Sequence, residues 1–229
     1  MKKLITILAG IVLSASAFAQ LSIGVHGTGN LSSAALNTDN FIHPVKKARV
    51  LSGAGIVVNF AASEKVSLRS GINFLQHGVK ITNSIESDPG NGFTIIKFEG
   101  TTDLNYLQVP VNILYTIPVN NFQLFAGGGP YCSFGISGKV KSTTTTIFNG
   151  TTEIIKSEQD AFKKEADNGA GFKRADYGVG AVAGIMLPNR LYGNIGYQLS
   201  FANIDDEEGG KYKNRGLQLT IGYFFQGRK

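Results

Sequence analysis

Strict alternation between apolar and small or polar residues is the feature that most constrains how this chain can fold. The clearest example covers residues 107–115. One set of alternate positions holds Leu107, Val109, Val111, Ile113 and Tyr115. The other set holds Gln108, Pro110 and Asn112. Because successive side chains of a β-strand point to opposite faces, this pattern predicts a strand with one apolar face and one small or polar face.

Further candidates for such strands are spread over the chain after residue 20. They cover residues 21–26, 53–60, 66–74, 122–140, 177–187, 191–201 and 217–225. Most have a clear apolar face, but the glycine-rich segment 122–140 leaves the assignment of its two faces open. Together with 107–115 they predict an all-β, antiparallel fold of eight strands.

The composition of the other face indicates where the apolar face is turned. Strands on the outside of a soluble protein usually carry charged side chains, but here that face holds glycine and uncharged polar residues, with Arg69 as the main exception. Charged residues make up 17% of the chain, against ~25% in typical soluble domains. After residue 20, no apolar run approaches the ~18 residues of a membrane-spanning helix. We therefore expect an eight-stranded antiparallel transmembrane β-barrel, an up-and-down meander with its apolar face in lipid.

The lengths of the connections support this interpretation. Long connections at 32–47, 82–102, 141–173 and 203–213 alternate with short ones at 61–65, 118–121 and 188–190. Outer-membrane barrels have long external loops and short periplasmic turns, so we expect both termini to be periplasmic. Asn149-Gly150 predicts a type I′ hairpin outside the barrel, and the turn residues 88–92 predict that the third and fourth strands extend outward. We expect a helical turn within 157–166.

The first segment resembles an export signal. Lys2 and Lys3 precede an apolar stretch from Leu4 to Ala15, and Ala17-Phe18-Ala19 gives a small-x-small cleavage pattern. The alternative is an uncleaved anchor, for which the apolar stretch is short. We therefore expect residues 1–19 to be a cleaved signal peptide and residues 20–229 to form the barrel domain.

Three short motifs carry a resemblance to a known family. Tyr106-Leu107-Gln108-Val109-Pro110-Val111 is followed by Phe125-Ala126-Gly127-Gly128-Gly129-Pro130-Tyr131, and Ser70-Gly71-Ile72-Asn73-Phe74 precedes both. These stretches resemble the PorT-type outer-membrane β-barrel family. Gly222-Tyr223-Phe224-Phe225 is similar to the C-terminal aromatic signal of outer-membrane barrels, although four residues follow it. The resemblance implies an outer-membrane barrel recognised by the barrel-assembly machinery. The family includes a secretion-associated protein but no common activity.

Several residue groups could carry chemistry, and most have a plainer interpretation. Gly178-x-Gly180-x-x-Ala183 matches a dinucleotide fingerprint in letters, but it lies inside an alternating segment without the required helix. Cys132 is the single cysteine and is expected to pack as a small apolar residue. His26 and His77 could face the same lumen, without carboxylates that would complete a metal site. The acidic run Asp205–Glu208 could bind calcium but is typical of a solvated loop tip.

A second set of candidates would belong to the rim of the barrel. Lys139 and Lys141 lie at the end of the fifth segment. We expect a basic rim at the depth of the lipid head groups, formed by Lys46, Lys47, Arg49, Lys173, Arg174, Lys211, Lys213 and Arg215. Clustered cations bind anionic lipid phosphates at ~1 kcal/mol each, so this rim could bind glycolipid; the alternative is ordinary loop solubility. The acidic run is expected to lie away from it, at a loop tip.

These patterns favour a non-enzymatic envelope protein with a structural, surface-interaction or secretion-associated role. An eight-stranded barrel is filled by its own side chains, so an open pore is not expected. The alternative is a lipid-modifying hydrolase or acyltransferase, in which His43 would act at the outer rim with Ser32, Ser33 or Asp39. A small soluble ligand-binding barrel is a third class. We expect a monomer with no cofactor and no bound nucleic acid, whose partners are outer-membrane lipid and glycolipid, the assembly machinery and envelope or secretion proteins.

Overall fold

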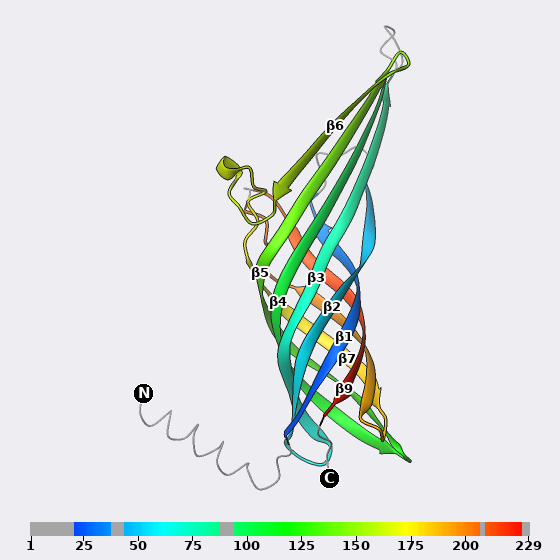
Figure 1. The fold of residues 1–229 in the computed structure, drawn as a ribbon, viewed down its shortest axis with the longest axis vertical. Coiled ribbons are helices and arrows are strands. Elements are labelled where there is room, and N and C mark those ends of the chain that lie inside the picture. Colours follow the sequence, from blue (N-terminus) through cyan, green and yellow to red (C-terminus); the bar gives the residue numbers. More distant parts are fainter. Residues whose placement is uncertain (1–20, 38–43, 88–93, 207–208, 226–229) are drawn as a thin grey trace, which may run out of the picture.

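The computed structural model describes residues 21–37, 44–87, 94–206 and 209–225 of the 229-residue chain. This part of the chain forms nine strands and one short 3-10 helix (Figure 1). The elements are β1 (Leu21–Leu36), β2 (Val45–Ala61), β3 (Val66–Ser87), β4 (Thr94–Val119), β5 (Phe122–Phe148), β6 (Thr151–Asp160), η2 (Glu165–Asp167), β7 (Ala175–Met186), β8 (Leu191–Ser200) and β9 (Tyr212–Phe224). None of the described helices is long and apolar enough to cross a membrane.

Eight of the strands close into a ring by antiparallel pairing. The order around it is β1–β2–β3–β4–β5–β7–β8–β9, and β1 pairs with β9 from Gly24↔Phe224 to Leu36↔Tyr212. β6 pairs with β5 alone and lies outside the ring. The eight-stranded antiparallel meander expected from the sequence is thus confirmed.

The two ends of the barrel differ as the connection lengths predict. Short turns at 62–65, 120–121 and 187–190 lie at one end, together with the start of β1 and the end of β9. We call this the turn end, and the opposite end the loop end. Figure 1 shows that the strands continue well beyond the barrel at the loop end.

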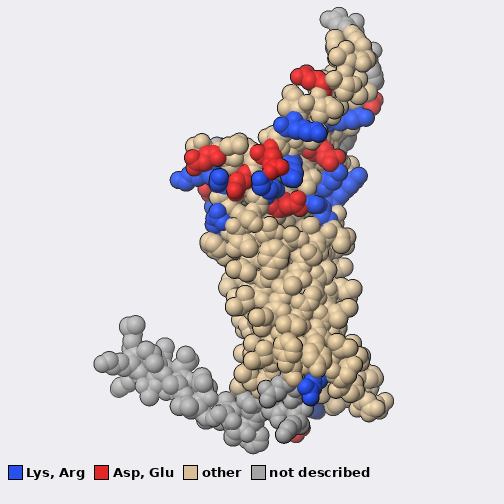
Figure 2. Space-filling view, viewed as in Figure 1, with Lys and Arg blue, Asp and Glu red and all other residues tan. Residues whose placement is uncertain are grey.

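The outer surface of the barrel is apolar, as the alternation predicts. Ile113 is 64% exposed and Ile72 is 60% exposed, while Gln108 on the opposite face of β4 is only 1% exposed. In Figure 2, charged side chains gather at the loop end, and the wall below them shows uncharged residues. Exposed apolar residues in such a band are typical of lipid contact.

One bulge explains why the faces of the fifth segment could not be assigned. On β5, Ser137 pairs with Asn105 but Gly135 pairs with the next residue, Tyr106, so Ile136 is an extra residue. A single extra residue shifts the alternation by one position. Even-numbered residues such as Phe134 face outward before the bulge, and odd-numbered residues such as Lys139 are exposed after it.

The expected loops at 82–102 and 141–173 are largely strands, which corrects the sequence-based boundaries. β3, β4 and β5 continue past the level of Thr82↔Glu99↔Thr143, where pairing of β2 with β3 ends, and form with β6 a protruding sheet. The expected hairpin is present: Asn149 and Gly150 have φ of 46° and 83°, as a type I′ turn requires. The expected loops at 32–47 and 203–213 are also shorter than expected, because β1 reaches Leu36 and β9 starts at Tyr212. Residues 157–160 are strand rather than helix, and the helical turn is η2.

Candidate functional site

An apolar plug closes the lumen at the loop end. It consists of Ala34, Val79, Leu104, Tyr106, Ala161, Phe162, Ala202, Ile204 and Tyr212. Phe162 comes from the turn after β6, and its ring meets that of Tyr106 edge to face at 6.0 Å. Gly135 makes this possible, because a Cβ at that position would overlap the Phe162 ring. The plug therefore combines residues of the ring with residues of the loops.

A polar layer lies next to the plug inside the lumen. Asp176 accepts hydrogen bonds from Ser200 Oγ and from Asn214 Nδ2, the latter at 2.8 Å. Asn214 Nδ2 also lies 3.4 Å from the Tyr106 hydroxyl, which joins this layer to the plug. Asp176 is 2% exposed. The sequence analysis missed it, although it continues the inward-facing series of Gly178 and Gly180 by two residues.

A second part of the polar layer crosses the lumen. Gln108 on β4 and Gln198 on β8 exchange two amide hydrogen bonds, of 3.2 and 3.1 Å. Gln108 Nε2 also donates to Ser133 Oγ at 3.2 Å. These side chains fill the width of the barrel, as expected for eight strands.

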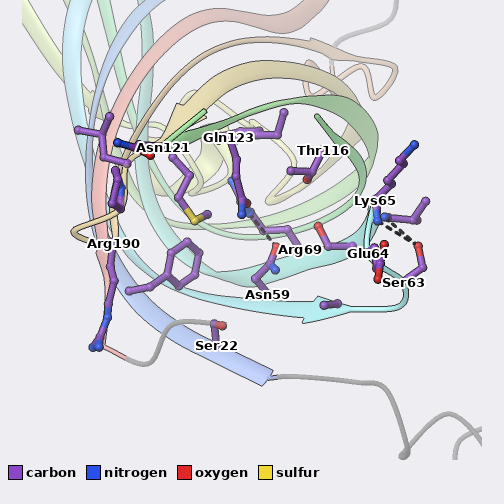
Figure 3. A pocket seen from close by; sticks show the side chains of 18 residues that line it. Ser22, Asn59, Ser63, Glu64, Lys65, Arg69, Thr116, Asn121, Gln123 and Arg190 are labelled. Atoms are coloured by element: carbon purple, nitrogen blue, oxygen red, sulfur yellow. Dashed lines mark hydrogen bonds between the residues drawn. The ribbon is translucent and has the colours of Figure 1, made fainter. Parts of the chain in front are cut away.

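The turn end contains a cavity of about 390 Å³ (Figure 3). Arg69 lines it and is 8% exposed, which confirms that this charge faces the lumen. Its guanidinium carbon lies 4.4 Å from the ring centroid of Phe125, 5.2 Å from that of Tyr192 and 5.5 Å from that of Phe224. Aromatic faces attract a cation at such distances. The lumen therefore holds a cation at the turn end and a carboxylate, Asp176, near the loop end.

Some cations of the expected basic rim form ion pairs with described acidic residues, and others do not. Arg49 forms an ion pair with Asp103, and Lys173 Nζ lies 2.9 Å from Asp206. Arg174 donates a 2.7 Å hydrogen bond to the Gly135 carbonyl and lies 5.0 Å from the Phe162 ring centroid, so it supports the plug. The remaining rim residues, Lys46, Lys47, Lys211, Lys213 and Arg215, form none of the described ion pairs.

Three of these lysines gather around the end of β1. Lys46 Nζ donates a 3.0 Å hydrogen bond to the Leu36 carbonyl. Lys213 pairs in register with Ala35, and the Lys211 carbonyl accepts a hydrogen bond from the Asn37 amide. Figure 2 shows Lys and Arg side chains interspersed with acidic ones in this band at the loop end. The structure therefore places the lysines together at the edge of the apolar wall.

The acidic residues lie closer to the rim than expected. Asp206 pairs with Lys173, and Lys173 Nζ also donates to the Asp205 carbonyl at 3.3 Å, so these two residues are not at a separate loop tip. Glu207 and Glu208 lie outside the described residues. On β6, Glu158 contacts Lys139 at 2.6 Å and Lys141 at 3.5 Å. The pKa of Glu158 is lowered, because Lys139 donates a hydrogen bond to it and both lysines favour its charged form.

A family comparison decides what kind of barrel this is. Residues 18–206 match the family model described as the outer membrane protein beta-barrel domain. The chain belongs to this family. It is therefore an outer-membrane β-barrel protein, as its apolar wall indicates. No curated protein matches the chain.

Solved structures of small outer-membrane proteins are among those similar to it. The attachment invasion locus protein Ail of Yersinia pestis has 15% identity and a TM-score of 0.41, with 91% of this chain and 99% of that chain covered. OprG from Pseudomonas aeruginosa has 14% identity and a TM-score of 0.41, with coverages of 92% and 97%. Neisserial surface protein A has 9% identity and a TM-score of 0.34, with coverages of 90% and 97%.

Of the residues considered for lipid chemistry, the structure describes Ser32, which is buried, and Ser33, which is partly exposed. His43 and Asp39 lie outside the described residues. Ser32 Oγ lies 3.4 Å from Nδ1 of His77 rather than at the outer rim. Both residues are at most 2% exposed, so a lipid cannot reach this pair from the membrane. The lipid-modifying alternative gains no support from them.

The remaining candidates also have structural roles. His26 Nδ1 lies 3.2 Å from the Tyr192 hydroxyl. Within the described ranges, no three His, Cys, Asp or Glu side chains are grouped as metal ligands. Gly178 and Gly180 lie inside β7, and Cys132 is exposed on the lipid-facing side of β5.

The plug and the polar layer predict that the barrel does not conduct ions. Purified protein in planar lipid bilayers should give no stable single-channel steps, because side chains close the lumen at two levels. Electrophysiology at 1 M salt would measure this directly. Large, reproducible conductance steps would show that the plug opens in the membrane.

Proposed function

We propose that this outer-membrane protein is a non-enzymatic envelope protein that binds other proteins through its loop end. In this proposal the turn end and both termini face the periplasm, and the loop end faces the outside of the cell. The observation that carries the proposal is the protruding sheet, which extends beyond the lipid-facing wall and ends in the edge strand β6 (Figure 1).

β6 has the properties of an edge strand that accepts a partner. It pairs with β5 on one side only, and the described residues supply no strand on its other side. Ile154 and Ile155 are 57% and 58% exposed. An edge with unpaired backbone groups and apolar side chains can bind an extended segment as an additional strand. The closed lumen leaves this surface as the main place for interaction.

Photo-crosslinking in intact cells tests this proposal. A photoreactive residue at Ile155 should give adducts with other proteins, and protease added outside the cells should remove them. The same residue at Ile113, on the apolar wall, is the matched control and should crosslink lipid. Adducts at Ile155 that resist external protease, or no protein adducts there at all, would contradict the proposed orientation and role.

Other parts of the proposal rest on the sequence. We assign the chain to the PorT-type subgroup on its motifs, and a secretion-associated role would follow from that resemblance. The barrel-assembly machinery and envelope or secretion proteins are the proposed partners, and the protein is proposed to act as a monomer. We also propose that residues 1–19 are removed as a signal peptide.

The rim is proposed to bind the phosphates of anionic glycolipid through the lysines that form no ion pair with the described residues. Replacing Lys46, Lys47, Lys211 and Lys213 together with glutamine should lower thermal stability in glycolipid-containing membranes, because clustered cations contribute ~1 kcal/mol each at such a surface. Stability in neutral detergent should not change. Thermal unfolding in both media measures the difference.

Two controls separate lipid binding from structural effects. Lys65→Gln changes a cation at the turn end and should have no effect in either medium. Arg174 is left intact because it contacts the plug. Equal losses of stability in glycolipid membranes and in neutral detergent would exclude a lipid-binding role for the rim.

A further inference from the structure

The cation inside the turn end, Arg69, forms no ion pair with the residues that the structure describes. Its side chain is buried, and the residue is 8% exposed. Buried charges in proteins are normally paired with an opposite charge or held by several hydrogen bonds. Asp176, the buried carboxylate of the lumen, is instead engaged by Ser200 and Asn214.

The hydrogen bonds of Arg69 are also incomplete. A guanidinium carries five N–H donors. Among the described residues, Arg69 makes one hydrogen bond, from Nε to Asn59 Oδ1 at 3.2 Å. Figure 3 shows this bond inside the pocket. The rings of Phe125, Tyr192 and Phe224 interact with the cation but accept no conventional hydrogen bond. Donors of the guanidinium therefore remain for a ligand.

The cavity in front of Arg69 is large enough for an organic molecule. Its volume of about 390 Å³ far exceeds the ~10–15 Å³ that a single water needs. Its walls combine apolar side chains, including Met186, Leu187 and Phe224, with polar ones such as Thr116 and Gln123. Residues of all three short turns line it, so it opens at the turn end.

Three other charged residues, Glu64, Lys65 and Arg190, line the same pocket. Arg190 lies at the edge of the pocket (Figure 3). Its guanidinium donates a 2.7 Å hydrogen bond to the Phe225 carbonyl. Lys65 and Glu64 belong to the turn at its mouth. A negatively charged group that enters would meet one buried cation at the floor and an apolar wall beside it.

We propose that this cavity binds a small amphipathic anion, a carboxylate or phosphate on a short apolar chain. The guanidinium of Arg69 donates two hydrogen bonds to the anionic group, a geometry that suits both carboxylate and phosphate. The apolar chain packs along Met186, Leu187 and Phe224. This site is independent of the protein-binding role of the protruding sheet, and with the proposed orientation it takes its ligand from the periplasm.

Side-chain NMR of the folded protein in phosphatidylcholine nanodiscs tests the proposal. Titration with hexanoate or hexyl phosphate should shift the Nε–Hε signal of Arg69, which is identified by its absence in Arg69→Met. Hexan-1-ol should not shift the signal, because it lacks the charge. Inorganic phosphate should bind more weakly than hexyl phosphate, because it lacks the apolar chain. The two hexyl anions separate a carboxylate ligand from a phosphate ligand.

Asn59→Asp is the decisive variant, since it tests the charge without removing Arg69. It places a carboxylate where Asn59 Oδ1 now accepts the bond from Nε, so Arg69 gains an internal partner. The variant should fold and should bind hexanoate and hexyl phosphate about 10- to 100-fold more weakly, the range expected for losing hydrogen bonds to a charged group. Arg190→Gln, at the edge of the same pocket, should bind within about twofold of the unaltered protein.

Two results would overturn the proposal. One is binding of the hexyl anions to Asn59→Asp at unchanged affinity. The other is a response of the Arg69 signal to hexan-1-ol as large as its response to hexanoate. Neither result bears on the crosslinking of β6, so failure of this site and failure of the proposed protein-binding role can be distinguished.

Discussion

Replacing Ile113 with arginine should lower the free energy of unfolding in lipid vesicles by about 2–4 kcal/mol, the range for a cation at the bilayer midplane of a β-barrel. Ile113 is 64% exposed on the outer face of β4, and its register partner on β3, Leu68, is also exposed and apolar. A guanidinium there would be placed in hydrocarbon without a partner. Urea titration of the protein folded in vesicles would measure the loss.

Asn112→Ser is the matched control because Asn112 is the neighbouring residue and lines a lumen cavity. It should change stability by much less than Ile113→Arg, since the lumen is polar and already contains Asn73 and Thr220. Similar losses for the two variants would show that the outward face of β4 has been assigned to the wrong side.

Replacing Phe162 with alanine should cost about 3–5 kcal/mol of unfolding free energy, the usual range for a buried phenylalanine. Phe162 is 9% exposed and packs against Tyr106, Gly135 and the guanidinium of Arg174. Because it comes from the turn after β6, its loss would also release that turn from the mouth of the lumen. Urea or thermal unfolding in neutral detergent would measure the effect.

Phe148→Ala is the control for this experiment. Phe148 is 48% exposed at the tip of the protruding sheet, and the same change of side chain there removes little packing. It should therefore alter stability by less than about 1 kcal/mol, as surface substitutions usually do. If both phenylalanine variants lose the same stability, Phe162 does not hold the plug together.

The alternation of the sequence was sufficient to predict the barrel because each lipid-facing strand must carry its own apolar face. The lengths of the connections located the short turns, and the turn residues Asn149-Gly150, which favour positive φ, located the hairpin. The alternation was insufficient on β5, where one extra residue at Ile136 exchanges the faces. It also underestimated the length of β3, β4 and β5 at the loop end, since strands outside the membrane need no apolar face.

The candidate sites were predicted less completely than the fold. Arg69 was recognised as an inward charge, but nothing in the local sequence connects it with Phe125, Tyr192 and Phe224, which lie on three other strands. Arg174 and Lys173 lie near the loop end, and their contacts with Gly135 and Asp206 depend on how β5, β7 and the following loops meet.

Except on β5, the sequence by itself determined which residues face lipid and which face the lumen, because that choice follows from the two-residue period of each strand. The tertiary structure alone decided which lumen residues meet. Gln108 reaches Gln198, and Arg69 lies among three aromatic rings, only because the ring closes between β1 and β9 with one particular stagger. Contacts across a barrel depend on its diameter and on the offset between strands, and both are properties of the closed sheet rather than of any single segment.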